Sequence, residues 1–342
     1  MKIWIAWLQV LIPLVVLWKI CGMLVEGIAG IVCHFPKLSS QTMGELAVLR
    51  FNIALLGISC FAVLVVQNGG CPDIAVATVF GYCLFNLLAT LGICVYRRDL
   101  PSSSLAYGSG ALLLMVVALM TLILRDGHIA WPESLAAVML YGGYHYRYQR
   151  RLPPSETGPT NPSLPLWLSL LYLLGSLAII GVACHFLVAG SIAITLWQTI
   201  PHTLLGTLVI AIGISIPNLV LLKNFMRHHQ SDMVVATVVS GQLQGILIGL
   251  GLPLLVLNVT GTVYTLAGSS RALPFEKFTL VFSLFYLLIS CVLFLICIKR
   301  SINRVKGIGL LAWYCIYCAT LLISYVMRDS HWVRSLPIWL GF

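Results

Sequence analysis

Two segments of the chain are near copies of each other: Asp73-Ile-Ala-Val-Ala-Thr-Val79 and Asp232-Met-Val-Val-Ala-Thr-Val238. Each is preceded by a second shared element, which reads Gly57-Ile-Ser59 in the first copy and Gly213-Ile-Ser215 in the second. The two elements recur after 159 and 156 residues, so the offset changes by three, as a loop insertion would cause. The sequence therefore predicts two copies of one structural unit.

The composition places both copies in a lipid bilayer. Of the 342 residues, 60% are hydrophobic and 9% are charged, and the mean hydropathy is +0.99. A soluble domain has about 25% charged residues. A membrane-spanning helix needs about 20 mostly apolar residues, because lipid offers the backbone no hydrogen-bond partner. Ten runs of this kind are present: Ile5–Val32, Leu46–Val66, Ile74–Tyr96, Leu105–Leu124, Ile129–Tyr146, Leu166–Leu187, Leu204–Phe225, Met233–Leu257, Phe278–Ile298 and Ile308–Val326.

One polar segment rich in proline and serine, residues 147–164, divides these runs five and five. We interpret it as a cytoplasmic linker between a first half, residues 1–146, and a second half, residues 165–342. The repeated elements then fall within about 46–96 and 204–257. An odd number of spans in each half makes the two copies point in opposite directions across the membrane. The expected fold is all-α integral membrane, with ten transmembrane helices as two inverted five-helix repeats.

The net charge of +10 has a topological explanation. With ten spans, the loops of one face carry thirteen Lys and Arg residues and those of the other carry six. Cytoplasmic loops are enriched in Lys and Arg, so this bias places both termini outside the cytoplasm. The basic residues indicate contact with membrane lipid and give no signal for nucleic-acid binding. The short linker favours a compact protein of the plasma (inner) membrane.

At the repeated elements the chain resembles the calcium/cation antiporter superfamily, the sodium/calcium exchangers and their relatives. Each half of that family carries G-T-S-x-P-E/D on one helix and D-x-A-x-G-N-x-x-G-S-N-x-F-N on the next. The matching stretches here begin and end at Gly57 and Ala62, Asp73 and Asn86, Gly213 and Asn218, and Asp232 and Gly245. Leu24-Val-Glu-Gly27 and Leu187-Val-Ala-Gly190 resemble the segments before each repeat. The resemblance implies ten spans, outside termini and secondary transport of cations.

The ion ligands of that family are largely replaced. The resemblance implies an ion pathway along Ser59, Ala62, Asn86, Ser215, Asn218 and, with a one-residue shift of the second repeat, Ser240 and Gln244. Ala62 and Asn218 stand where the family has acids, and Tyr82 stands where it has a serine. Ile58 and Ile214 replace the threonines. Calcium is bound by about six to eight oxygens, and carboxylates offset its dehydration. We therefore expect high-affinity calcium binding to be lost, with a monovalent cation or small polar solute as substrate.

The polar residues also have structural interpretations. Ser59, Ser215 and Asn86 suit hydrogen bonds between closely packed helices as well as ion ligands. Asp73 and Asp232 suit helix N-caps as well as a role in cation access. The alternative for the whole protein is a transport-inactive relative that keeps the helices as a membrane scaffold or complex subunit. No Ser-His-Asp set, phosphate loop or carboxylate pair stands out, so we expect neither an enzyme nor a cofactor.

Overall fold

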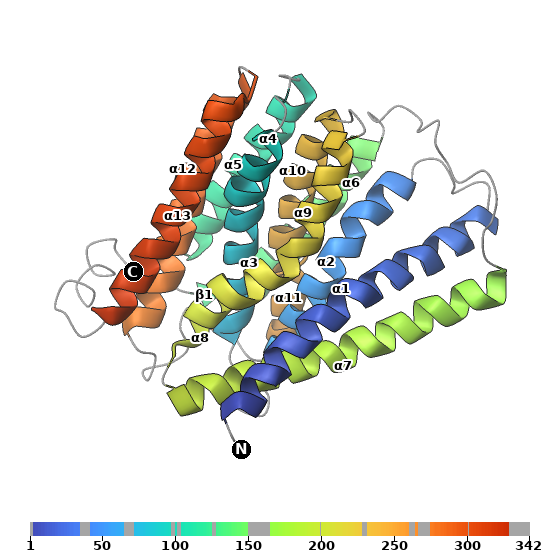
Figure 1. Ribbon diagram of the computed structural model, residues 1–342, viewed down its shortest axis with the longest axis horizontal. Coiled ribbons are helices and arrows are strands. Elements are labelled where there is room, and N and C mark those ends of the chain that lie inside the picture. The colour runs from blue at the N-terminus through green and yellow to red at the C-terminus, as the bar shows by residue number, and fades with distance from the viewer. Residues whose placement is uncertain are drawn as a thin grey trace.

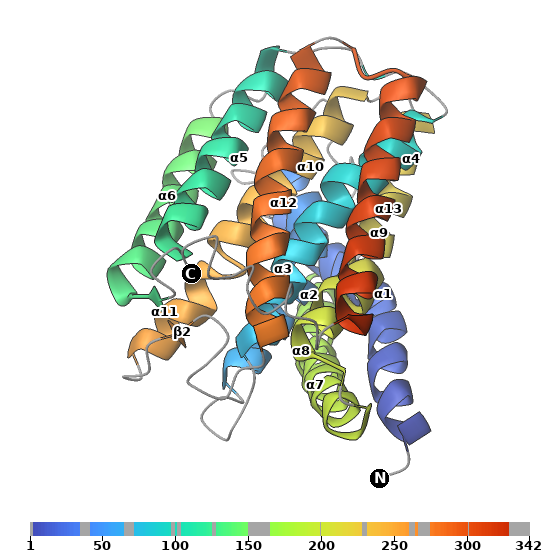
Figure 2. The same cartoon turned by 90° about the vertical axis from the view of Figure 1, so that its left-hand side faces the viewer.

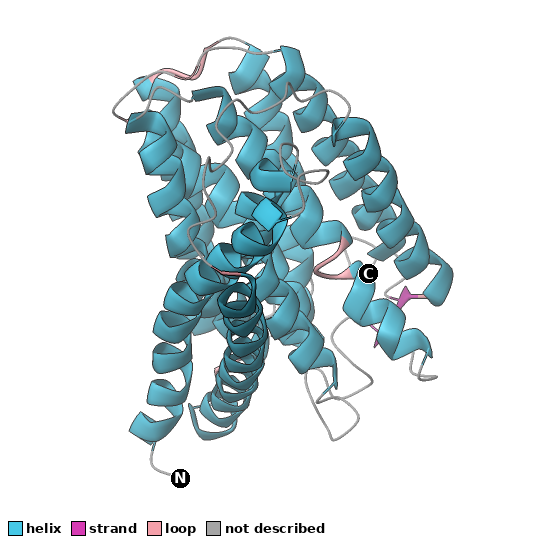
Figure 3. Cartoon of the chain, turned by 90° about the vertical axis from the view of Figure 1, so that its right-hand side faces the viewer, coloured by secondary structure: helices cyan, strands magenta, loops and turns pink. Residues whose placement is uncertain are grey.

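The protein is a bundle of helices with one short pair of strands (Figure 3). The structure, a computed structural model, describes residues 3–34, 42–64, 72–96, 100, 104–124, 128–149, 165–198, 200–227, 231–259, 264–265, 274–299 and 301–327. The helices are α1 (Ile3–His34), α2 (Thr42–Leu64), α3 (Pro72–Leu84), η3 (Phe85–Thr90), α4 (Leu91–Val95), α5 (Ser104–Ile123), α6 (Trp131–Gln149), α7 (Leu166–Gln198), α8 (His202–Leu204), η5 (Leu205–Ile210), α9 (Ala211–Arg227), α10 (Ser231–Leu247), α11 (Gly251–Val259), α12 (Pro274–Lys299) and α13 (Arg304–Val326). The strands are β1 (His128–Ile129) and β2 (Tyr264–Thr265).

The predicted class, an all-α integral membrane protein, is confirmed. Within the described residues, seven helical segments are long and apolar enough to cross a membrane: Ile3–Leu24, Asp73–Val95, Leu166–Gln198, His202–Val220, Thr237–Val259, Phe278–Lys299 and Arg304–Val326. Two shorter apolar helices cover Asn52–Val63 and Tyr107–Ile123. The count of ten spans and their inversion stay predictions.

The centre of the bundle is the continuous helical segment α3–η3–α4, which is almost wholly buried (Figure 1). It packs against η5 through two glycines. Gly81 lies against the backbone of Thr207, and a Cβ added at Gly206 would lie 3.0 Å from the Ile74 carbonyl oxygen. Because no side chain separates the two helices here, their backbones approach closely. Asp73 is in the first turn of α3 and is buried, whereas the side chain of Asp232 falls outside the described residues.

Helices α1 and α7 lie side by side and run in opposite directions along one flank of the bundle (Figure 1). Their contact is made through one glycine from each helix. A Cβ added at Gly27 would lie 2.8 Å from the Leu173 nitrogen and 2.9 Å from the Ser169 carbonyl oxygen, both on α7. A Cβ added at Gly190 would lie 2.8 Å from Cβ of Gln9 and 3.1 Å from the Ala6 carbonyl oxygen, both on α1. Any larger residue at either glycine would push the two helices apart.

Two helix boundaries differ from the sequence expectation. The predicted run Met233–Leu257 is broken at residues 248–250, so that α10 and α11 are separate helices. Pro253 lies near the start of α11, where its missing N–H is tolerated; Gly249 lies within the break and Gly251 directly follows it. Helix α6 continues to Gln149, so the first residues of the predicted linker are helical, while residues 150–164 lie outside the described part of the chain.

Backbone pairing joins connecting segments at opposite ends of the bundle (Figure 2). Leu100 and Ile302 exchange two backbone hydrogen bonds of 2.9 Å beside the ends of α4 and α12. Arg304 adds a hydrogen bond of 2.7 Å to the Tyr96 hydroxyl at the same end. At the other end β1 pairs antiparallel with β2, with His128 opposite Thr265. Both links tie segments that lie more than a hundred residues apart in sequence.

Candidate functional site: a neutral pocket between α2, η3, α9 and α10

A buried network of polar side chains joins η3 to α9. The Asn86 amide nitrogen donates to the Tyr82 carbonyl oxygen at 2.9 Å and to the Ser215 hydroxyl at 3.3 Å. The Asn218 amide nitrogen donates to the Tyr82 hydroxyl at 2.7 Å and to the Asn86 side-chain oxygen at 3.3 Å. All four side chains are buried, the largest exposed fraction being 7% at Asn218. The network therefore connects the two repeated units in the middle of the bundle.

The backbone that carries Asn86 is a π-helical turn, η3, inserted in the α3–η3–α4 segment. Such turns contain one extra residue, and they occur frequently at functional sites. A second π-helical turn, η5, lies just before α9, which carries Ser215 and Asn218. Both repeated units thus depart from regular α-helix close to the residues that meet in the network.

A second hydrogen bond joins the units across α2 and α10. The Asn52 amide nitrogen donates to the Gln244 side-chain oxygen at 2.7 Å, and both side chains are buried. Asn52 is on α2 of the first unit and Gln244 is on α10 of the second. A buried bond between two amides favours one relative position of the two helices, because breaking it in an apolar interior is costly.

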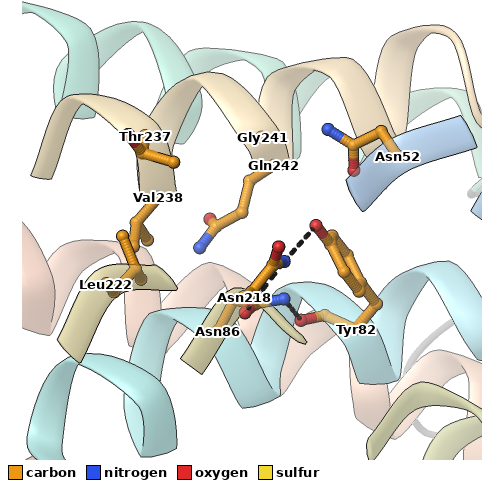
Figure 4. A pocket seen from close by; sticks show the side chains of 9 residues that line it. All are labelled: Asn52, Tyr82, Asn86, Asn218, Leu222, Thr237, Val238, Gly241 and Gln242. Carbon is orange, nitrogen blue, oxygen red and sulfur yellow. Dashed lines mark hydrogen bonds between the residues drawn. The ribbon is translucent and has the colours of Figure 1, made fainter. Parts of the chain in front are cut away.

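A small cavity lies between these two sets of bonds (Figure 4). The space that the centre of a water molecule can reach in it is about 10 Å³, which is about the least that one water needs. The residues that line it are Asn52, Tyr82, Asn86, Asn218, Leu222, Thr237, Val238, Gly241 and Gln242. Six of them carry polar side chains and none is charged. The cavity can therefore offer amide, hydroxyl and phenol groups to a ligand, but no carboxylate.

Tyr82 limits the size of this cavity. Its ring lies against α10 at two glycines: a Cβ added at Gly245 would lie 3.6 Å from Cε1 of Tyr82, and one added at Gly241 would lie 3.8 Å from its hydroxyl oxygen. The bulky phenol takes the place where the resemblance puts a serine, and the glycines of α10 make room for it. The missing side chains at Gly241 and Gly245 of α10 thus leave the space that the Tyr82 ring of α3 occupies.

Of the seven residues predicted from the resemblance, the structure brings three into direct contact. Asn86 is hydrogen-bonded to both Ser215 and Asn218. Gln244 is bonded to Asn52 at the edge of the cavity. Of the seven, only Asn86 and Asn218 line the cavity itself, and the three that take part in neither set of bonds are Ser59, Ala62 and Ser240. Ser59 and Ala62 are buried in α2, and the Ser240 hydroxyl donates to the Thr237 carbonyl oxygen at 3.3 Å.

The sequence reasoning missed three polar residues that line the cavity: Asn52, Thr237 and Gln242. Asn52 and Gln242 lie inside apolar runs, and a polar residue in such a run was the signal that would have drawn attention to them. Gln242 is fully buried, and neither its side-chain oxygen nor its nitrogen has a hydrogen-bond partner. The described residues contain no group of three or more His, Cys, Asp and Glu side chains that is suited to a metal ion.

Membrane-spanning helices around a buried polar pocket are the features that a membrane transport protein requires. The chain belongs to the sodium/calcium exchanger protein family, whose sequence model matches residues 5–147 and 168–323. The suspected membership of the calcium/cation antiporter superfamily is thereby confirmed.

Two curated relatives have similar sequences over most of their length. Inner membrane protein YrbG of Escherichia coli (strain K12) is 26% identical over 266 residues, which cover 70% of this chain and 73% of the relative. Putative antiporter CaxA of Alkalimonas amylolytica is 24% identical over 285 residues, which cover 77% of this chain and 84% of the relative. The first is named as an inner membrane protein and the second as a putative antiporter, and both names agree with the family.

Solved structures show the same fold. The H+/Ca2+ exchanger CAX superposes with a TM-score of 0.73 at 13% identity, covering 98% of this chain and 91% of that one. The sodium-calcium exchanger NCX_Mj superposes with a TM-score of 0.62 at 20% identity, covering 93% of this chain and 99% of that one. At these identities the likeness concerns the fold, and the chemistry of the site has to be argued from this chain's own residues.

Proposed function

We propose that the protein is a secondary antiporter that exchanges a monovalent cation, and not calcium, across the membrane. The observation that carries the proposal is the pocket itself, which holds about one water-sized particle and is lined by neutral residues. The family membership and the description of CaxA as a putative antiporter support the antiport mechanism.

The neutral lining is the argument against calcium. A divalent ion that leaves water needs carboxylates to offset its dehydration, and its usual shell has about six to eight oxygens. Among the residues that the structure describes, those that line the pocket include no acid. The free energy of transferring an uncompensated double charge into the membrane interior is strongly unfavourable. A single charge has a far smaller dehydration penalty, because that penalty rises steeply with ionic charge.

The size of the pocket favours an ion over an organic solute. The centre of a water-sized particle has about 10 Å³ to move in, which suits one water or one dehydrated monovalent ion. Even a small organic solute contains several non-hydrogen atoms and requires a larger space. Of the two substrate classes expected from the sequence, the monovalent cation is therefore the one that we propose.

The architecture that we propose is two inverted five-helix halves, residues 1–146 and 165–342, joined by the linker 147–164. The glycine contacts between α1 and α7 support it, because they are reciprocal. Gly27 and Gly190 are 163 residues apart, and so are their partners, Ala6 with Ser169 and Gln9 with Tyr172. A two-fold axis between two copies of one unit produces this pattern, because each copy then makes the same contact to the other.

The Gly-Ile-Ser elements make a similar exchange of partners. A Cβ added at Gly57 of α2 would lie 2.9 Å from the Cys184 sulfur on α7. A Cβ added at Gly213 of α9 would lie 2.6 Å from a methyl carbon of Leu14 on α1. The second helix of each half thus packs against the first helix of the other half. Ten spans and the bias of basic residues also support termini outside the cytoplasm of an inner membrane.

The test is ion flux into proteoliposomes that contain the purified full-length chain. Sodium, potassium and calcium gradients are imposed one at a time, with a second ion on the opposite side. We expect exchange of a monovalent cation and no calcium uptake above protein-free liposomes. Calcium uptake driven by a sodium or proton gradient would overturn the proposed specificity. Absence of flux for every ion would overturn the transport proposal and favour the scaffold.

A further inference from the structure

The orientation of the Asn86 amide is fixed by a backbone atom. Its partner at 2.9 Å is the carbonyl oxygen of Tyr82, which can only accept a hydrogen bond. The amide must therefore present its nitrogen to Tyr82. The Ser215 hydroxyl agrees with this assignment, because it donates its own proton to the Ala211 carbonyl oxygen at 2.6 Å and accepts from Asn86.

This orientation determines that of Asn218. With its nitrogen turned toward Tyr82, Asn86 directs its oxygen toward Asn218, 3.3 Å away, and Thr90 donates to the same oxygen at 3.4 Å. Asn218 must meet this acceptor with its nitrogen, which also donates to the Tyr82 hydroxyl. The Asn218 side-chain oxygen is left over: it is buried and has no hydrogen-bond partner. The chain of bonds from the Tyr82 carbonyl through Asn86 to Asn218 therefore leaves one unpaired acceptor at the pocket, the Asn218 side-chain oxygen.

Gln242 approaches the same cavity from α10. Its side chain extends from the helix into the space above the segments that carry Asn86, Asn218 and Leu222 (Figure 4). It is fully buried, and both polar atoms of its amide lack hydrogen-bond partners. Buried amides are nearly always satisfied in folded proteins, so an amide with two free atoms beside a cavity indicates that a ligand or a water molecule occupies that cavity.

We infer that the side-chain oxygens of Asn218 and Gln242 bind one dehydrated monovalent cation, and that Asn86 is the positioning residue that directs the Asn218 oxygen toward it. The ligand is a cation because the fixed member of the pair presents oxygen, and Gln242 is free to turn its own oxygen inward. Gln242 lies inside the second motif, which runs from Asp232 to Gly245, but it is not one of the seven residues of the ion pathway that the resemblance implies. The inference rests on the proposed function and names the two side-chain oxygens that would bind the transported ion.

The experiment measures ion binding without transport. The full-length protein in detergent is titrated with sodium chloride or potassium chloride against N-methyl-D-glucamine chloride at constant ionic strength, and the thermal unfolding midpoint is followed. We expect one of the two ions to raise the midpoint in a saturable way. Gln242→Leu and Asn218→Leu should each weaken the apparent affinity by about tenfold or more, because each removes a neutral oxygen that contacts a charge.

The matched control is Thr78→Val. Thr78 is also fully buried with a hydroxyl that has no hydrogen-bond partner, but it does not line the cavity. Its removal should leave the ion-dependent shift unchanged. An equal loss of ion response in Thr78→Val and Gln242→Leu would overturn the site, since the effect would then be a general one of core polarity. An unchanged ion response in Gln242→Leu would overturn it as well and leave water as the occupant.

The positioning role of Asn86 has its own test. In Asn86→Leu the Asn218 amide is free to turn over, so the apparent affinity for the ion should fall. The unfolding midpoint measured without the ion shows whether the variant is still folded. Adding Asn218→Asp should restore binding, because a carboxylate presents oxygen in either orientation. A residue with a merely structural role would not be rescued by this change. If the protein binds the ion but shows no flux, the proposed transport is contradicted and the binding site is not. If the protein shows flux but the variants bind the ion as well as the unaltered protein does, the binding site is contradicted and the transport is not.

Discussion

The Asn218 amide nitrogen donates a hydrogen bond of 2.7 Å to the Tyr82 hydroxyl, and this bond joins α9 to α3 across the pocket. It explains how the site tolerates a phenol where the related family has a serine. The ring fills space against Gly241 and Gly245, and its hydroxyl holds Asn218 in place. Tyr82 therefore acts on both the volume and the orientation of the site, and substitutions can separate the two effects.

Tyr82→Phe keeps the ring and removes the hydroxyl. The Asn218 nitrogen then keeps only its bond to Asn86, and the free energy of unfolding should fall by about 1 to 2 kcal/mol. Tyr82→Ser instead enlarges the cavity and should broaden transport toward larger monovalent cations such as rubidium and caesium. The check is competition flux in proteoliposomes, and equal ion selectivity in Tyr82→Ser and Tyr82→Phe would contradict the volume argument.

Asn218→Glu should introduce calcium binding, and Ala62→Glu should not. Both positions correspond to acids in the related family, but in this structure only Asn218 lines the cavity. A carboxylate at 218 would offset part of the dehydration of a divalent ion, whereas one at 62 would be buried away from it. Calcium-dependent thermal stabilisation of each purified variant distinguishes the two, and a calcium response in Ala62→Glu alone would show that the pathway runs along α2.

Gly27→Val and Gly190→Val should each weaken the packing of α1 on α7 to a similar extent. The added side chains would meet backbone atoms at about 3 Å, so the helices must move apart, at about 1 to 3 kcal/mol each. Gly175→Ala on α7 is the matched control, because a Cβ there meets nothing within 4 Å. Unfolding midpoints of the three variants test this, and a harmless Gly190→Val beside a damaging Gly27→Val would argue against reciprocal halves.

Asn52 and Gln244 should show energetic coupling in a double-mutant cycle. Asn52→Leu and Gln244→Leu each leave one buried amide without the partner that now lies 2.7 Å away. The double variant removes both, so its destabilisation should be smaller than the sum of the single effects by about 0.5 to 3 kcal/mol. Denaturant or thermal unfolding in a defined detergent gives the three values, and strict additivity would mean that the bond contributes little to stability.

The helical membrane fold could be predicted from the sequence because the signal is local: the length and hydrophobicity of each apolar run indicate a membrane-spanning helix without any knowledge of tertiary contacts. The same locality explains the errors at boundaries. Helix α7 extends to Gln198, past the expected end at Leu187, because its contacts with α1 stabilise further turns. The break between α10 and α11 depends on glycine and proline inside an apolar run, which hydropathy alone does not register.

The candidate site was predictable only where a repeated motif marked it. Asn86, Ser215 and Asn218 lie in the motifs and meet in the structure. Gln242 lies two residues before Gln244 on α10, and nothing in the sequence says which of the two glutamines meets a partner amide. Burial of Gln242 beside the cavity, and the chain of bonds that turns Asn218, depend on distances between helices that are set by tertiary packing.

The volume of the pocket has an electrical consequence. If the exchange proposed above moves one singly charged ion in each direction, the two transport steps carry equal and opposite charge across the membrane. Such a cycle moves no net charge, so the membrane voltage neither drives it nor opposes it. The direction of exchange would then be set by the two concentration ratios alone, and the protein would keep working in a cell whose membrane is depolarised.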